Sequence, residues 1–349
     1  MNAVQEIRVG DAEVVLTGGT ESMSQAPYAV RNTRWGTKYG VDLKMEDTLA
    51  AALVDRYPQE IPMGMTAEKL GSKYGVTRQD CDQYALQSQQ RWANAQKSGN
   101  FKGEISPVSI KTRKGVEEFA VDEHARPQTT IESLAKLPSV FKKDGLVTAG
   151  NASGISDGAA AVIVASEEAV KKYGLKPLAR IVSYHVEGVE PSIMGIGPVP
   201  AIKGVLKKSG WSLKDADLLE VNEAFAAQYL AVEKELGLDR SITNTNGGAI
   251  ALGTLLFLSC GLTHFQSRTP AGRIWKSHHG PLDARVASHR KEASYWICLY
   301  WRWPRHCHCH RKGLKSCEYN LLFPTVDYAN FFLSIPAMVC LRFLSLFGK

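Results

Sequence analysis

The composition of the chain changes at Gly253, and this change limits what the chain can fold into. The first 253 of its 349 residues contain 29 Lys and Arg, 31 Asp and Glu, and 25 of the 30 glycines. The remaining residues contain 13 basic and 4 acidic residues, six of the seven cysteines and seven of the nine histidines. The net charge of +7 is therefore −2 before Gly253 and +9 after it. We expect the two parts to differ in origin and not to form one uniform fold.

The first part has the composition of a reduced, intracellular globular protein. Cys81 is its single cysteine, so no disulfide framework is expected. The opening MNAVQEIRVGDAEVV contains acidic residues and no apolar core, which predicts no targeting segment. Residues Tyr328–Phe347 are the longest apolar stretch, but Pro336 and Arg342 interrupt it. We therefore expect no membrane span.

Short apolar runs alternate with helical patterns in the first part. Glu13–Thr17, Ala159–Ala165 and Leu218–Val221 have the length and composition of buried strands. A helical pattern over Ala224–Leu236 follows the last of them. This alternation predicts an α/β fold, in which ligands bind at the carboxyl ends of strands. Asn222 occupies such a position.

Helix start and stop signals are also visible. Asn2–Val9 predicts a helix that Gly10 ends, and a second one opens near Pro198. Thr77 lies three residues before Asp80, the spacing of a capping box. The helix that this box predicts has one apolar face, formed by Cys81, Tyr84, Ala85, Ser88 and Trp92.

Seven ordered blocks within residues 1–253 carry a specific resemblance. They are GGTESMSQAPY, PMGMTAE, DEHARPQTT, GLVTAGNASGISDGAAAVI, MGIGPVPAI, VNEAF and NTNGGAIALG. Together they resemble the thiolases, in particular the mitochondrial 3-ketoacyl-CoA thiolases of fatty-acid β-oxidation. A single block such as VNEAF would be a weak signal, whereas seven in order are a strong one.

The resemblance implies an α/β, layered α-β-α-β-α fold of two similar halves with an inserted loop domain, here incomplete at both ends. Residues 1–27 would be a remnant of the N-terminal half, 28–144 the loop domain and 145–171 the returning strands of the N-terminal half. Residues 172–253 would begin the C-terminal half, and 254–349 would be a tail outside the family. The resemblance further implies the mitochondrial matrix and association into thiolase homo- or hetero-oligomers.

The implied chemistry is acyl transfer between CoA thioesters, with coenzyme A as substrate and no cofactor. A cysteine nucleophile, an activating histidine and an acid/base cysteine act with the Asn of an NEAF motif. Residue by residue, only Asn222 matches, as an oxyanion-hole position. The nucleophile would precede Met1, and Thr254-Leu255 replaces the His-Pro that follows the family's glycine. We expect no turnover, and the alternative is a non-catalytic isoform that binds CoA or full-length thiolase subunits.

Four further residues are binding candidates by the same resemblance. Ser153 lies in the small-residue loop that contacts the pantetheine arm, although a turn cap is the alternative. Met63 and Met194 align with apolar pocket residues, and an ordinary core methionine is an equal alternative. Phe225 is interpreted as either pocket wall or core.

Three other residues have less specific interpretations. The mid-helix position of Cys81 favours a small buried side chain over a reactive thiol. His124 is expected to be a surface histidine of the loop domain, and Glu223 is expected to support the turn at Asn222.

The tail is explained by a change of reading frame. Codons can be chosen for Ala293–His310 that, shifted by one base, encode QVIGSACIGGGQGIAIV, which contains the family's C-x-G-G-G-Q-G motif. This interpretation covers the tail from about Ala293, and the origin of 254–292 stays open. His306-Cys307-His308-Cys309-His310 has zinc-ligand types, but an extended strand would point its histidines and cysteines to opposite faces. We therefore expect no metal site, and no nucleic-acid partner for the basic tail.

Overall fold

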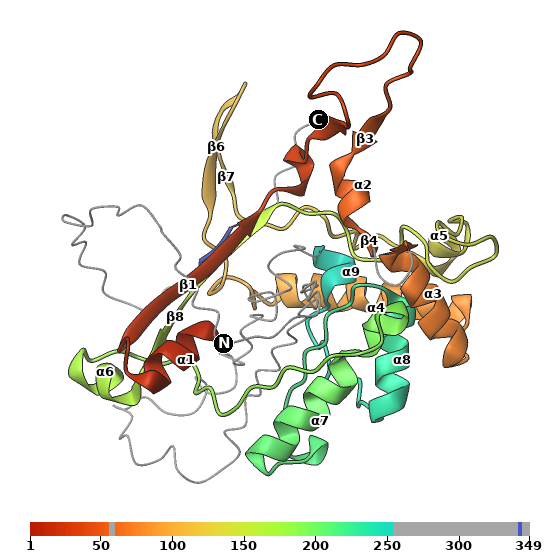
Figure 1. The fold of residues 1–349 in the computed structure, drawn as a ribbon. Coiled ribbons are helices and arrows are strands. Elements are labelled where there is room, and N and C mark those ends of the chain that lie inside the picture. The colour runs from red at the N-terminus through yellow and green to blue at the C-terminus, as the bar shows by residue number, and fades with distance from the viewer. Residues whose placement is uncertain (56–59, 254–340, 344–349) are drawn as a thin grey trace, which may run out of the picture.

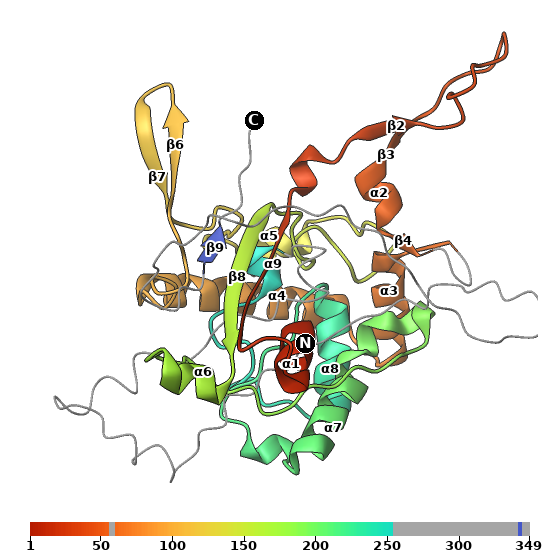
Figure 2. The ribbon, with the colours of Figure 1, turned by 60° about the vertical axis from the view of Figure 1, so that its left-hand side comes forward.

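The computed structural model describes residues 1–55, 60–253 and 341–343 (Figure 1). The chain forms a narrow antiparallel sheet, a helical body and two projecting hairpins. Figure 2 shows both hairpins on the same side of the helical body. Within the described ranges, no helix has the length and apolar character needed to cross a membrane.

The sheet pairs β1 (Val14–Glu21) with β8 (Gly158–Ala165) in antiparallel register, from Val14 opposite Ala165 to Glu21 opposite Gly158. The other edge of β8 pairs with β9 (Leu341–Phe343). Two of the predicted strands are therefore present. Their predicted full burial is wrong, because Val14 and Leu16 are 41% and 72% exposed. Among the described strands, β1 pairs with β8 alone, so one of its edges is open.

The main helices are α1 (Asn2–Val9), which packs on the sheet, and five that form the helical body. These five are α3 (Met63–Lys73), α4 (Arg78–Lys97), α7 (Pro198–Ser209), α8 (Ala226–Leu236) and α9 (Ala249–Leu252). The predicted capping box of α4 is confirmed, since Thr77 and Asp80 exchange side-chain to backbone hydrogen bonds. All five residues of the predicted apolar face of α4 are buried.

Two apolar clusters hold this body together. The larger joins α4, α7 and α8, and at its centre the rings of Tyr84 and Tyr229 stack with centroids 4.2 Å apart. The smaller contains Trp92, Ala125 and Leu252, and it packs the residues before α5 against α4 and α9. Both clusters include residues of α4, and this helix packs against α8 and α9.

One helix was not predicted, and one predicted strand is wrong. Residues 28–144 contain α3 as well as α4, and the sequence pattern missed α3 because its buried face is built from small residues such as Gly64, Ala67 and Gly71. Leu218–Val221 is not a regular strand. Leu219 forms one parallel bridge with Thr243.

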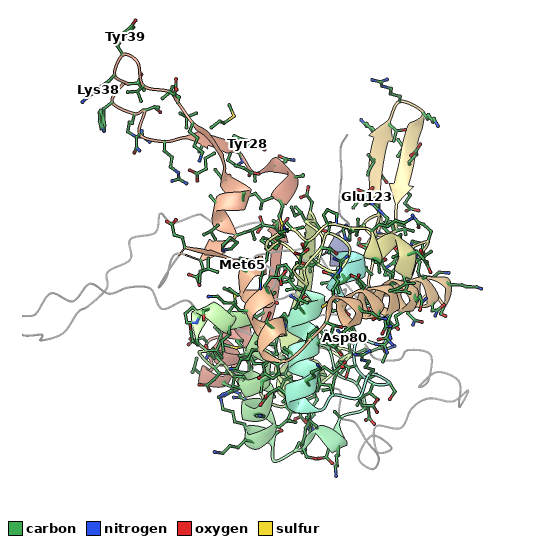
Figure 3. All side chains as sticks on the ribbon, turned by 90° about the vertical axis from the view of Figure 1, so that its right-hand side faces the viewer. Tyr28, Lys38, Tyr39, Met65, Asp80 and Glu123 are labelled. Carbon is green, nitrogen blue, oxygen red and sulfur yellow. The ribbon has the colours of Figure 1, made fainter. Side chains whose placement is uncertain are left out.

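The projecting segments are two hairpins. β2 (Tyr28–Val30) and β3 (Met45–Asp47) form the base of an arm whose tip carries the exposed Tyr39 (Figure 3). β6 (Val108–Thr112) and β7 (Gly115–Phe119) form the second hairpin. The remaining short elements are η1 (Met23–Gln25), α2 (Thr48–Ala52), β4 (Val54–Asp55), β5 (Ile61–Pro62), α5 (Ile131–Ala135), α6 (Glu167–Lys172), η2 (Pro191–Ile196) and η3 (Leu213–Asp215).

Candidate functional site

The loop that contains Ser153 lies directly against the loop that contains Asn222. The backbone N–H of Ser153 donates to the carbonyl of Ala224 at 2.9 Å. Ala152 and Phe225 form an antiparallel bridge beside it. Ser153 thus lies in a backbone segment adjacent to that of Asn222 and Phe225, although about seventy positions separate it from them along the chain.

A buried amide shapes the Ser153 loop. The Oδ1 of Asn151 accepts from the backbone N–H of Thr148 at 2.8 Å, and its Nδ2 donates to Asp82 at 2.9 Å. The backbone carbonyl of Asn151 accepts from the N–H of Ala226 at 2.8 Å, at the start of α8. Asn151 therefore ties the loop to α4 and α8 at once.

Asp82, which accepts from Asn151, is itself held by Arg78. Arg78 pairs with the buried Asp82 at 2.8 Å, and its other guanidinium nitrogen donates to the carbonyls of Leu134 and Leu137. Asp82 is 3% exposed, so this ion pair is partly shielded from water. Both the carboxylate and the guanidinium have several partners, which fixes their geometry.

Glu223 is the centre of a second buried network, next to Asn222. Its carboxylate accepts from the hydroxyls of Tyr84 and Ser88, both at 2.7 Å. It also accepts from the Asn244 amide at 3.1 Å and the Ile250 N–H at 3.2 Å. Burial raises the pKa of Glu223, while the hydrogen bonds from Ser88 and Tyr84 oppose that shift. The support of the Asn222 turn by Glu223 stays a prediction, because none of these contacts involves Asn222 itself.

The sequence predicted a strand before Asn222, but the Asn244 side chain bonds the backbone there instead. Its Oδ1 accepts from the N–H of Val221 at 2.9 Å, and its Nδ2 donates to the carbonyl of Val221 at 2.8 Å. Its own backbone N–H donates to Leu219 at 3.0 Å. The backbone of Val221 is therefore satisfied by one side chain, and no continuous neighbouring strand is required there.

Two glycines make room for the Glu223 network. A Cβ on Gly248 would lie 2.2 Å from the carboxyl carbon of Glu223. Gly247 has a φ of +81°, and a Cβ there would lie 2.6 Å from the carbonyl of Ser88. The Gly-Gly pair of NTNGGAIALG thus permits close approach between α4 and the chain entering α9.

Met63, Met194 and Phe225 lie on three elements that pack together. Met63 begins α3, Met194 is in η2, and Phe225 precedes α8 as its N-cap. α3 contacts both η2 and α8. All three side chains are partly exposed, and Phe225 meets Phe141 edge to face, with centroids 6.3 Å apart. Their role in ligand binding stays a prediction.

Cys81 is confirmed as a buried side chain. It is 0% exposed in the middle of α4, and burial together with the nearby Asp82 raises the pKa of its thiol to about 12. A thiol of this kind is protonated at neutral pH and is a poor nucleophile. It is the free cysteine of the described part of the chain.

Sequence reasoning missed Tyr84, Ser88 and Asn244 as parts of the site. The signal that could have found two of them is their spacing, because Tyr84 and Ser88 lie four residues apart on the apolar face of α4. Hydroxyls on a buried face need a polar partner, and Glu223 is that partner here. Nothing in the local pattern indicated Asn244.

Comparison with known families decides the identity of this site. The family model described as "Thiolase, N-terminal domain" matches residues 1–168, and "Thiolase, C-terminal domain" matches residues 175–261. The chain belongs to the thiolase family. The resemblance seen in the seven blocks is confirmed, and so is the thiolase-like α/β fold.

This chain spans 64% of the length of the thiolase relatives that it matches. The mitochondrial 3-ketoacyl-CoA thiolases of Mus musculus and Homo sapiens are each 66% identical over 253 residues, which is 72% of this chain and 64% of theirs. The crystal structure of human mitochondrial 3-ketoacyl-CoA thiolase superposes with a TM-score of 0.71 at 66% identity, covering 73% of this chain and 64% of that one. The same human enzyme in complex with CoA gives a TM-score of 0.70 at 65% identity, with 73% and 63% covered.

Several predictions concern residues that the structure leaves undescribed. The His306–His310 segment, the frame-shifted stretch and most of Tyr328–Phe347 lie outside the described residues. The zinc and membrane questions raised for them, and the domain limits drawn from the resemblance, remain predictions.

Proposed function

We propose that the chain binds coenzyme A thioesters through the Ser153 loop, as a member of the 3-ketoacyl-CoA thiolase group located in mitochondria. The observation that carries this proposal is the 2.9 Å hydrogen bond from Ser153 to Ala224, which sets the small-residue loop beside Asn222. The similarity to a thiolase solved in complex with CoA supports the same ligand. The chemistry of the group is thiolysis of a 3-ketoacyl-CoA to acetyl-CoA and a shortened acyl-CoA.

We propose further that this chain does not complete that reaction. Thiolysis needs a cysteine thiolate that attacks the ketone carbonyl and a base that deprotonates this cysteine. Cys81 is buried with a pKa of about 12, so it does not supply the thiolate. Thr254 and Leu255 stand where the resemblance calls for histidine and proline. Asn222 alone can polarise a carbonyl but cannot form an acyl-enzyme.

The binding proposal is tested by calorimetric titration of the purified chain with CoA. We expect saturable binding, and we expect Ser153→Leu to weaken it by about tenfold because a branched apolar side chain fills the loop surface. Ser72→Leu is the matched control, since Ser72 is exposed on α3 away from this loop. Equal affinities for all three proteins would contradict a CoA contact at Ser153.

The lack of turnover is tested in the same preparation. We expect no acetyl-CoA above a blank without protein when 3-ketoacyl-CoA and CoA are supplied. Measurable thiolysis that disappears in Asn222→Ala would contradict this proposal.

A second candidate function is association with intact thiolase subunits. It is favoured by the edge of β1 that no other described strand pairs with, and by Leu16, which is 72% exposed on β1. Exposed edges and apolar strand faces commonly pair with another chain. Co-purification of the chain with a full-length 3-ketoacyl-CoA thiolase would support this function, and its absence at micromolar concentrations of both would exclude it.

A further inference from the structure

The ring of His124 lies directly against the Ser153 loop. A Cβ placed on Gly154 would come within 1.9 Å of Cε1 and 2.3 Å of Nε2 of His124. The imidazole therefore covers the backbone of the residue that follows Ser153. His124 is half-buried at this contact, so the loop covers part of the predicted surface histidine.

The other side of His124 faces α9. His124 makes a hydrogen bond with the backbone of Ile250. Gln89 of α4 reinforces the contact, since its Nε2 donates to the Ile250 carbonyl at 3.4 Å and its Oε1 accepts from the Arg126 N–H at 2.8 Å. Ala125 packs in the apolar cluster that includes residues of α9. The segment on both sides of His124 is thus held on α4 and α9.

The end of α9 returns to the same loop. A Cβ on Gly253 would lie 1.8 Å from the Oγ of Ser156 and 3.2 Å from the carbonyl of Gly154. Three segments, the Ser153 loop, the residues around His124 and the end of α9, therefore meet at one point. His124 is the titratable side chain in contact with both the loop and α9.

The charges around His124 favour its neutral form. Burial lowers the pKa of His124 and the nearby Arg126 lowers it further, while the hydrogen bond to Ile250 and the charge of Asp122 oppose the shift. The unfolded chain, with an ordinary histidine, takes up a proton at higher pH than the folded one. Protonation on acidification below about pH 6.5 therefore works against the folded contact.

We propose that His124 is a positioning residue, which holds the Ser153–Gly154 backbone in its CoA-binding conformation while its ring is neutral and releases it when the ring is protonated. This inference rests on the proposed binding of CoA to the Ser153 loop. It adds a pH response to that site through a side chain that acts on the loop.

The test compares CoA affinity between pH 5.5 and 7.5 for the full chain, His124→Gln, His124→Phe and the control His185→Gln. His185 also packs against a glycine, Gly204 of α7, but it pairs with Glu187. The phosphates of CoA titrate in this range for every variant, so the difference between variants is the informative quantity. We expect the wild-type and His185→Gln affinities to fall by about fivefold more than those of the two His124 variants on acidification.

The two His124 variants separate ring packing from protonation. His124→Phe keeps the ring, so we expect near-wild-type affinity at pH 7.5 with no excess loss at pH 5.5. His124→Gln loses the packing, so we expect weaker binding by about threefold to tenfold at pH 7.5. If the CoA affinity of both His124 variants fell on acidification as much as that of wild type, the proposal would be overturned.

Amide hydrogen exchange without CoA separates this inference from the proposed function. We expect the amides of residues 149–158, corrected for intrinsic exchange, to lose protection at pH 5.5 in wild type and to keep it in His124→Phe. If wild type bound no CoA at any pH, the proposed function would fail and the exchange result would still decide the role of His124. Equal protection in wild type and both variants at each pH would refute it.

Discussion

At the scale of single residues, Glu223 is the side chain on which the Asn222 segment most depends. Its carboxylate is 1% exposed and receives donors from α4, from Asn244 and from the start of α9. A buried carboxylate of this kind is stable only while its partners are in place. The position of Asn222 in space is therefore a consequence of contacts made by its neighbour.

We predict that Glu223→Ala lowers the free energy of unfolding by about 3–5 kcal/mol, because two hydroxyls and an amide lose their buried acceptor. Glu223→Gln keeps the shape and one acceptor, so a loss of about 1–2 kcal/mol is expected. Urea denaturation followed by fluorescence measures both. A loss below 1 kcal/mol for the alanine variant would show that the network is not structurally coupled.

At the scale of elements, α4 connects the segment of Asn151 to the segment of Glu223. Its first turn is capped by Thr77 and Asp80, its buried face carries the two hydroxyls that bind Glu223, and Asp82 pairs with Asn151. One helix thus positions both site loops. Both networks, around Glu223 and around Asn151, form only if α4 presents these side chains to the two loops.

Removing the cap of α4 should therefore destabilise the whole body. We predict that Thr77→Ala lowers the free energy of unfolding by about 1 kcal/mol, since the side-chain acceptor for the Asp80 N–H is lost. Thr77→Ser keeps the hydroxyl and should stay within about 0.5 kcal/mol of wild type. Thermal unfolding followed by circular dichroism distinguishes the two, and equal melting temperatures for both variants would contradict the capping role.

At the scale of the whole molecule, the sheet is less well covered than the helical body. β1 carries Val14 and Leu16 on an exposed face, whereas the helical body buries a continuous core. Exposed apolar side chains beside an open strand edge favour association with another chain. The proposed pairing with thiolase subunits belongs to this surface.

We predict that Leu16→Lys reduces self-association and capture by an intact thiolase, because a charge on β1 opposes strand pairing. Val116→Lys is the matched control, since Val116 is 68% exposed on β7 of the second hairpin. Sedimentation velocity of the two variants and the wild type measures the effect. Identical distributions for all three would show that β1 is not the association surface.

Local sequence signals determined several of the helices and the family. The cap at Thr77, the stop at Gly10 and the small-residue loop around Ser153 are encoded within a few residues, and the structure contains the corresponding helices and loop. The family blocks are likewise local strings of sequence, which the two domain models match. Such features depend on backbone preferences and short hydrogen bonds, so distance along the chain does not weaken them.

The tertiary structure alone decided what surrounds Asn222. The pairing of Glu223 with Tyr84 joins residues 139 positions apart, and the contact of His124 with Gly154 comes from two separate loops. A segment read as a strand before Asn222 is instead satisfied by the amide of Asn244. These outcomes depend on which buried polar groups meet after the chain packs, and no local pattern of hydrophobic residues specifies that.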